Sequence, residues 1–207
     1  MQNRLKLLIL GIFGFFIFIF FSYLVHKDLF TQLDFNTTVR LQDNIPRRFD
    51  EPFSIFSEIG KFEPMIILLV IILLLRRKLW GIVAFGFFGF LHILELYGKI
   101  FVEHLPPPEF MLRAKHLIDF PQFHIRSEFS YPSGHSARAA FLSIIFGIIV
   151  LRSKKLSKIH KAIILSILIV YDVVMLVSRV YLGEHWTSDV IGGGLLGLSL
   201  GLLSILF

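Results

Sequence analysis

Residues 159–207 read IHKAIILSILIVYDVVMLVSRVYLGEHWTSDVIGGGLLGLSLGLLSILF. Two apolar runs, 159–177 and 190–207, flank a short segment that is more polar. The residues of that segment with chemical interest are Ser178, Arg179, His185 and Asp189. Each run is close to the roughly 20 residues that a helix needs to cross the hydrocarbon core of a bilayer. The stretch therefore predicts two membrane helices joined at the membrane surface.

The composition of the whole chain agrees with a membrane location. Of its 207 residues, 55% are apolar and only 17% are charged, and the mean hydropathy is +0.74. These values lie outside the range of ordinary soluble domains. The net charge of +6 does not indicate nucleic-acid binding, because the basic residues lie beside apolar runs and form no separate basic domain. The absence of cysteine excludes disulfides, thiolate metal sites and cysteine nucleophiles.

Four further apolar runs precede this stretch. They lie at residues 5–25, 55–75, 79–102 and 137–151. The run 55–75 is the most polar of them, with Glu58, Lys61 and Pro64, and 137–151 is short for a membrane span. The first run is long and lacks a small-residue cleavage site, so we interpret it as a retained helix and not as a signal peptide. We expect an all-α integral membrane protein, with about six transmembrane helices bundled into a single domain over 1–207.

Basic residues predict the orientation of these spans. Arg4 and Lys6 precede the first span, residues 76–78 read Arg-Arg-Lys, and five further basic residues lie in 152–161. Cytoplasmic loops of membrane proteins carry an excess of lysine and arginine, so these three segments are predicted to be cytoplasmic. The connections 27–54, 103–136 and 178–188 then lie on the external side. We expect a multi-pass protein of the cell membrane.

Three segments on the predicted external side carry residues suited to phosphate chemistry. His185 and Asp189 are four residues apart and share one face if a helix begins there. The carboxylate can then hold one ring nitrogen while the other attacks phosphorus. The other residues that suit a phosphate site are Lys99, Ser133, Gly134, His135 and Arg179. Cations, a hydroxyl and a backbone N–H at a glycine can together stabilise anionic oxygens, which predicts a phosphoryl-histidine mechanism.

These segments resemble the three-part signature of the type 2 phosphatidic acid phosphatase superfamily. In that family the parts are Lys, six residues, Arg-Pro; then Pro-Ser-Gly-His; then Ser-Arg, five residues, His, three residues, Asp. The second part is complete at residues 132–135 and the third at residues 178–189. The first part differs, because Lys99 is followed after six residues by Pro106-Pro107, so that proline replaces the arginine. The resemblance extends over about residues 79–197.

The resemblance implies a helical bundle whose active site lies at the external membrane interface and uses neither a metal nor an organic cofactor. It implies that His185 is the nucleophile, Asp189 orients it, and His135 first protonates the leaving group and then activates water. The implied phosphate-binding residues are Lys99, Ser133, Gly134 and Arg179. Two arginines are candidates to replace the one missing from the first part: Arg113 in the same external loop, and Arg138, three residues after His135.

Each of these residues also has a plainer interpretation. Lys99, Arg179 and Arg138 are equally consistent with anchors at helix ends, and Arg113 with a solvated loop charge. The two histidines with Asp189 are also consistent with metal ligands. Ser133-Gly134 suits an ordinary turn before a helix. All of these interpretations would have to hold together for the site to be absent, and we therefore favour the enzyme.

Other ionisable residues lie within or beside the apolar runs. His92 and Glu95 are three apart and are predicted to pair as helical neighbours, and Asp172 is predicted to face the bundle interior. Further basic residues of the long external loop are candidates for contact with a lipid headgroup or solvent; they are Lys115, His116, His124 and Arg126.

We expect an integral-membrane lipid phosphatase that hydrolyses a phosphate monoester or diphosphate of a membrane lipid. Candidate substrates are polyprenyl diphosphate, phosphatidylglycerophosphate and phosphatidate, whose anionic heads lie at the right depth. Two alternatives remain: a phosphotransferase of the same fold, and a membrane protein that has lost turnover, which Pro106 suggests. The expected partners are the lipid phosphate and the bilayer; the sequence indicates no nucleic acid and identifies no protein partner.

Overall fold

The computed structural model describes residues 2–76, 80–114 and 128–204, and over these ranges the chain is helical without strands. Its α-helices are α1 (Gln2–His26), α2 (Thr31–Asn44), α3 (Asp50–Glu58), α4 (Phe62–Arg76), α5 (Trp80–Phe101), α6 (Gly134–Arg152), α7 (Lys158–Tyr181) and α8 (Thr187–Leu203). Two short 3-10 helices, η1 (Arg47–Phe49) and η2 (Glu109–Met111), lie in the connections. Arg77, Lys78 and the loop residues Lys115, His116, His124 and Arg126 lie outside the described ranges.

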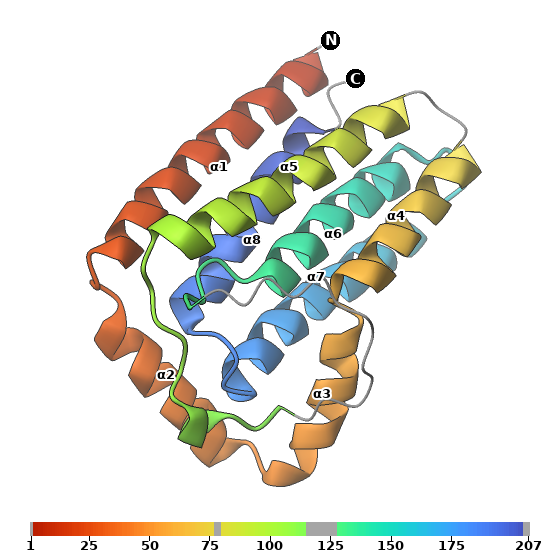
Figure 1. Cartoon of the computed structure of the whole chain (residues 1–207). Coiled ribbons are helices and arrows are strands. Elements are labelled where there is room, and N and C mark those ends of the chain that lie inside the picture. The colour runs from red at the N-terminus through yellow and green to blue at the C-terminus, as the bar shows by residue number, and fades with distance from the viewer. Residues whose placement is uncertain (1, 77–79, 115–127, 205–207) are drawn as a thin grey trace.

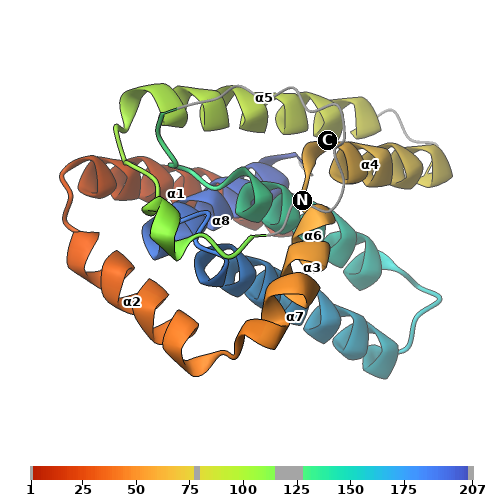
Figure 2. The ribbon, with the colours of Figure 1, turned by 60° about the horizontal axis from the view of Figure 1, so that its bottom comes forward.

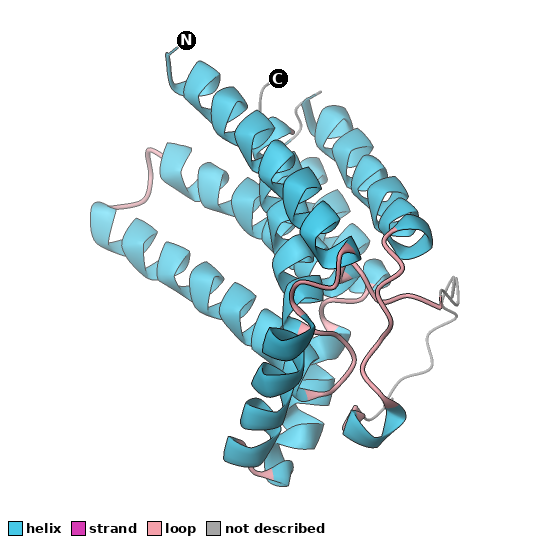
Figure 3. Ribbon diagram, turned by 90° about the vertical axis from the view of Figure 1, so that its left-hand side faces the viewer, coloured by secondary structure: helices cyan, strands magenta, loops and turns pink. Residues whose placement is uncertain are grey.

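Six of the helices run side by side, and α2 and α3 form a V across one end of this bundle (Figure 1). The bundle end that carries α2 and α3 is called the α2–α3 end below. Both chain termini lie at the opposite end (Figure 1). The side view shows that most of the connecting loops, drawn in pink, lie toward this end of the bundle (Figure 3). The predicted connection at 27–54 is therefore mostly helical, which its polar composition did not reveal.

The prediction of an all-helical membrane protein is confirmed, whereas the number of six spans is not. Four helices, α1, α5, α6 and α7, are long and apolar enough to cross a bilayer. Helices α4 and α8 are apolar but shorter, with apolar segments at Phe62–Ile72 and Thr187–Leu203. A locally thinned bilayer, or flanking side chains that extend to the interface, is needed for helices of this length to span it.

The predicted continuous span at 55–75 is wrong in its first third. Helix α3 ends at Glu58, the chain turns, and α4 begins at Phe62. Glu58 and Lys61 pair across the turn at 2.6 Å. The Gly60 backbone passes so close to His135 that a Cβ at residue 60 would collide with its ring. The polar residues within this apolar run therefore mark a helix break that places α3 over the bundle end.

Helix α8 lies inside the bundle, where it packs against α1 and α6 (Figures 1 and 2). Glycines four residues apart form the contact with α6: a Cβ at Gly193 would collide with the carbonyl oxygen of Ser133, and one at Gly197 with that of Ala137. Residues four apart lie on one helix face, so these glycines form a seam along which the two backbones touch. The seam fixes the start of α6 against the start of α8.

Candidate active site

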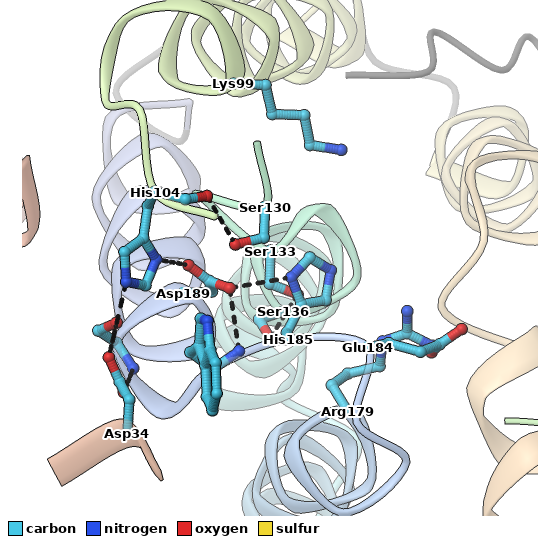
Figure 4. Close-up of polar contacts among 12 residues, drawn as sticks. Asp34, Lys99, His104, Ser130, Ser133, Ser136, Arg179, Glu184, His185 and Asp189 are labelled. Carbon is cyan, nitrogen blue, oxygen red and sulfur yellow. Dashed lines mark hydrogen bonds and ion pairs between the residues drawn. The ribbon is translucent and has the colours of Figure 1, made fainter. Parts of the chain in front are cut away.

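The predicted site residues lie at the α2–α3 end of the bundle, and all but Arg113 gather in one place there; Arg113 lies instead against Tyr181, whose hydroxyl bonds Asp50 of α3. Lys99 lies in the last turn of α5 and Arg179 in the last turn of α7. Ser133 caps the start of α6, so Gly134 and His135 are in its first turn. Figure 4 shows Lys99 and Arg179 approaching from different helices, with His185 between them. Three chain segments that are distant in sequence thus converge on one place.

His185 and Asp189 form the predicted pair, although α8 begins only at Thr187. The His185 Nδ1 lies 3.3 Å from Asp189 Oδ2, and the Trp186 N–H donates to the same oxygen at 3.0 Å. The Asp189 backbone carbonyl accepts from the Ser133 N–H at 3.0 Å, which joins the second and third sequence segments directly. The side chain of Asp189 is fully buried. His185 is thus oriented by Nδ1, and its Nε2 is the nitrogen left for chemistry.

His135 lies where the charges of the site meet. The charged or ionisable groups that act on it electrostatically include those of Arg179, Arg138, His185 and Lys99. Its Nε2 is buried and, within the described part of the chain, accepts and donates no hydrogen bond. A histidine nitrogen without a protein partner, surrounded by cations, is suited to exchange a proton with an anionic ligand.

Arg179 is held by two neighbours. Its guanidinium contacts the Ser57 hydroxyl of α3 and forms an ion pair with Glu184. Its Nε is buried without a hydrogen-bond partner among the described residues. Because an arginine presents five N–H donors, this arrangement leaves donors for a further anion.

A second carboxylate, that of Glu95, contacts the cations on the α5 side of the site. Glu95, Lys99, Arg138 and His92 are called the Glu95 cluster below. Glu95 is buried and faces Lys99 Nζ at 3.3 Å, Arg138 Nη1 at 3.0 Å and His92 Nδ1 at 3.2 Å. Arg138 also donates through Nε to the Gly60 carbonyl at 3.1 Å. The predicted pairing of His92 with Glu95 is confirmed.

Gly134 lies against the Glu95 cluster. A Cβ at residue 134 would collide with the Glu95 carboxylate and the Arg138 guanidinium, so any larger residue would displace the cations. The first N–H groups of α6 also begin here, and such groups lack intrahelical acceptors. Together, backbone N–H groups and cations at a helix N-terminus form a surface that favours an anion.

Comparison with known proteins agrees with this geometry. A family model described as the PAP2 superfamily matches residues 64–207, which is more than half of the chain. The chain belongs to the PAP2 superfamily. The resemblance predicted from the three segments is therefore confirmed.

Individual PAP2 relatives support the assignment. Phosphatidylglycerophosphatase B of Bacillus subtilis (strain 168) is 32% identical over 138 residues, which are 66% of this chain and 63% of the relative, a little under two thirds of its length. The crystal structure of a transmembrane PAP2 type phosphatidylglycerolphosphate phosphatase from B. subtilis superposes with a TM-score of 0.75 at 26% identity, covering 94% of this chain and 93% of that one. Aquifex aeolicus LpxE shares the fold, with a TM-score of 0.63 at 23% identity over 84% of this chain and 96% of that one.

The two candidate replacement arginines of this PAP2 protein lie in different places. Arg138 belongs to the Glu95 cluster beside Gly134. Arg113 instead lies over the ring of Tyr181, with its guanidinium carbon 5.2 Å from the ring centroid and Nη1 3.3 Å from the tyrosine hydroxyl. Its backbone N–H donates to the Leu182 carbonyl at 2.8 Å. Pro106, where the family has arginine, is exposed.

The sequence analysis did not single out His104 and Asp34, which lie beside the pair of His185 and Asp189. These four residues are called the Asp189 cluster below. His104 Nδ1 lies 2.8 Å from Asp189 Oδ1, and its Nε2 lies 3.8 Å from Asp34 Oδ2. Asp34 in α2 accepts from the Ser188 N–H at 2.7 Å and from its hydroxyl at 2.6 Å. His104 lies within the first motif segment, between Lys99 and Pro106, which was the one available signal.

The two histidines that face Asp189 differ in their protonation. Burial acts to lower the pKa of His104, but the hydrogen bond and charge of Asp189, together with the charge of Asp34, raise it above its ordinary value. Burial lowers the pKa of His185, and the hydrogen bond of Asp189 opposes this without reversing it. A proton is therefore bound more tightly by His104 than by His185.

Proposed function

We propose that this PAP2 protein is an integral-membrane lipid phosphatase that works through a phosphohistidine on His185. The observation that carries the proposal is the convergence of an oriented His185, the partnerless His135 Nε2 and three cations at one end of the bundle. Membership of the PAP2 superfamily and the names of its relatives support the same activity. The step needs no metal, because the positive charge is supplied by side chains.

In the first step the neutral Nε2 of His185 attacks phosphorus, and the bond from phosphorus to the leaving oxygen breaks. The His185 Nδ1–H stays directed at Asp189, which stabilises the imidazolium that forms. His135 gives its proton to the leaving oxygen, a lipid alkoxide from a monoester or a lipid phosphate from a diphosphate. Lys99, Arg179 and Arg138 are suited to balance the charge on the remaining phosphoryl oxygens.

In the second step water attacks the phosphohistidine and the bond from nitrogen to phosphorus breaks. His135, now neutral, takes the proton from that water, and inorganic phosphate leaves with His185 restored. The buried position of His135 Nε2 supports this double role, since a nitrogen with a fixed protein partner would have to break that bond in each step.

The substrate we propose first is phosphatidylglycerophosphate. Its support is the activity for which the B. subtilis matches are named: the sequence match is 32% identical, and the structural match covers 94% of this chain. Phosphatidate and polyprenyl diphosphate also present a terminal phosphoryl group, on a monoester and a diphosphate respectively, and remain in the proposed class.

Arg138 is our proposed replacement for the arginine that Pro106 displaces. Its support is its position, since it bonds Glu95 at 3.0 Å and would meet a side chain at residue 134. Arg113 contacts Tyr181 instead, so we assign it a structural role.

We further propose that the site faces outward from the cytoplasm in the cell membrane. Arg4, Lys6 and the basic residues of 152–161 lie at the end of the bundle opposite to the site, as the charge rule for cytoplasmic segments requires. The chain has no cysteine, so single cysteines report accessibility without background. We expect Glu109→Cys to be labelled from outside intact cells and Lys155→Cys only after lysis; the reverse pattern would overturn this orientation.

The activity is tested by phosphate release from phosphatidylglycerophosphate, phosphatidate and polyprenyl diphosphate, using detergent-purified protein with EDTA present. We expect release by the wild type, a loss of at least about 10³-fold in His185→Ala, and wild-type rates in the matched control His160→Ala. His160 lies in the first turn of α7, at the opposite end of the bundle, where its backbone N–H donates to the Ser157 hydroxyl at 3.3 Å. Release that requires a metal, or that persists in His185→Ala, would overturn the mechanism.

The intermediate is tested by brief reaction with a ³²P-labelled lipid diphosphate, followed by quenching in alkali, in which phosphohistidine survives. We expect label on the wild-type protein and none on His185→Ala. In His135→Ala, which lacks the acid of the first step and the base of the second, the label should form more slowly and persist longer once the labelled lipid is removed. Label that leaves only when an alcohol is added would identify the phosphotransferase alternative. No label and no release from a folded sample would favour the alternative without turnover.

A further inference from the structure

Both oxygens of the Asp189 carboxylate are occupied. Oδ2 faces His185 Nδ1 at 3.3 Å and accepts from the Trp186 N–H at 3.0 Å. Oδ1 faces His104 Nδ1 at the shorter distance of 2.8 Å. The carboxylate that orients the proposed nucleophile thus has a second histidine on its other side, as Figure 4 shows.

His104 is held on three sides. Its Nε2 faces Asp34 at 3.8 Å, and Asp34 is fixed to the first turn of α8 by two bonds from Ser188. The His104 carbonyl accepts from the N–H of Ser130 at 2.8 Å and from its hydroxyl at 3.1 Å. A side chain with no role beyond filling space would not need both ring nitrogens to face buried carboxylates, because burying these groups is costly unless they are paired.

The charges around the two histidines are unequal. Within the described part of the chain, the charged groups that act on His104 are acidic; they are Asp189 of α8, Asp34 of α2 and Asp28 of the turn before α2. The groups that face His185 are mixed, with Asp189 opposed by Arg179 of α7 and Lys99 of α5. A proton shared among these groups is therefore more stable on His104 than on His185.

We propose that His104, held by Asp34, is a positioning residue for the proposed reaction: as an imidazolium it fixes Asp189 and takes up part of its charge, which keeps His185 neutral and nucleophilic. This inference rests on the proposed function. Without the cation on Oδ1, the whole charge of Asp189 would act on His185 and favour its protonated, unreactive form. His104 touches neither phosphorus nor the leaving group, and it acts only through Asp189.

The test is the pH profile of kcat/KM for phosphatidylglycerophosphate in His104→Asn, whose amide nitrogen replaces Nδ1 but carries no charge. We expect the acidic limb to move to higher pH by about one unit, so that the loss of activity is greater at pH 6 than at pH 8. His26→Asn is the matched control, because His26 contacts the Val102 carbonyl at 3.1 Å and is not part of the Asp189 cluster. A purely structural role would lower the rate equally at all pH values, and an unmoved limb would overturn the proposal.

Asp34→Asn is a second variant, because it removes the other carboxylate that holds the proton on His104. We expect the same displacement of the limb, and it serves if His104→Asn does not fold. A ¹⁵N NMR titration of histidine-labelled wild type in detergent gives a readout without turnover. We expect His104 to be an imidazolium and His185 a neutral imidazole at pH 7, and a neutral His104 would overturn the proposal.

The same titration separates the two ideas. If the wild type releases no phosphate from any lipid, the proposed function fails. The role of His104 is then tested by the titration alone. It is supported if His185 takes up its proton at higher pH in His104→Asn than in the wild type, and it is wrong if His185 titrates alike in both. If the wild type is active and His185 titrates alike in both, the function holds and the role of His104 is wrong.

Discussion

The Glu95 cluster and the Asp189 cluster each place a buried carboxylate beside the site, but their partners differ. Glu95 faces the two permanent cations Lys99 and Arg138, besides His92. Asp189 faces two histidines and a backbone N–H. Lysine and arginine keep their charge through the neutral range, whereas histidine does not. In the proposed mechanism the first cluster thus supplies positive charge for an anion, and the second holds a proton on His104.

We expect the largest loss of activity from a substitution of Asp189, the carboxylate at the centre of the Asp189 cluster. In Asp189→Asn the amide cannot accept from both histidines and the Trp186 N–H as a carboxylate does. We expect phosphate release to fall by on the order of 10⁴-fold, as when the orienting carboxylate of a Ser-His-Asp triad becomes an amide. The exposed Asp43 of α2 supplies the control substitution, Asp43→Asn. A loss below about tenfold would mean that Asp189 does not orient the nucleophile.

A substitution of Glu95, the carboxylate of the Glu95 cluster, should mainly lower the stability of the folded protein. Glu95→Gln leaves the buried Arg138 guanidinium without its counter-charge, and breaking a buried ion pair in this way costs about 3 to 5 kcal/mol. We expect the Tm in detergent to fall by roughly 10 °C. Inorganic phosphate should restore part of that loss, because an added anion takes the place of Glu95. Equal stabilisation of wild type and variant by phosphate would contradict this, and Glu109→Gln, at an exposed site, is the control.

Arg138 of the Glu95 cluster, the proposed replacement for the missing arginine, can be tested by a substitution that keeps its charge and changes its geometry. Arg138→Lys keeps the charge but loses the fork that contacts Glu95 and Gly60. Loss of a charge-assisted hydrogen bond of about 1.5 to 3 kcal/mol corresponds to roughly 10- to 150-fold in kcat/KM. The matched variant Arg113→Lys should stay within about twofold, since Arg113 contacts Tyr181. Equal losses in both variants would remove the case for Arg138.

The smallest effect should be a pH dependence of stability from the Asp189 cluster. The folded pKa of His104 is raised above the ordinary 6.5, so the folded state binds this proton more tightly than the unfolded state does. That contribution is complete below about pH 6.5 and is lost as pH rises through the raised pKa. We expect the Tm of the wild type to fall more between pH 6 and pH 9 than that of His104→Asn. Parallel Tm curves would mean that His104 binds no extra proton.

The long apolar runs predicted much of the fold. The run 79–102 became α5 (Trp80–Phe101), and 159–177 lies within α7 (Lys158–Tyr181). The short run 137–151 is extended at its start because the helix begins at Gly134, inside the Pro-Ser-Gly-His motif. The prediction of one span over 55–75 was wrong because apolar residues continue on both sides of the turn at Gly60. The turn between α3 and α4 depends on contacts of Gly60 with α6, which the sequence pattern does not contain.

Part of the site could be predicted because its spacing is local. His185 and Asp189 are four residues apart, and Ser133 to His135 are consecutive. The link from His104 to Asp34 spans 70 positions and forms only when α2 folds over the start of α8 through Ser188. No period or motif in one sequence encodes such a contact. The choice between Arg113 and Arg138 likewise depended on what surrounds each of them in space.

The glycine seam between α6 and α8 has a mechanical consequence. Ser133 and Asp189, at the starts of α6 and α8, are held in register by backbone contacts at Gly193 and Gly197. Acyl-chain length changes bilayer thickness, and membrane helices accommodate the mismatch mainly by tilting. Two helices locked along a seam tilt as one body, so the spacing between the halves of the site should stay constant in thin and thick bilayers alike. The seam thus insulates the site from the elasticity of the membrane around it.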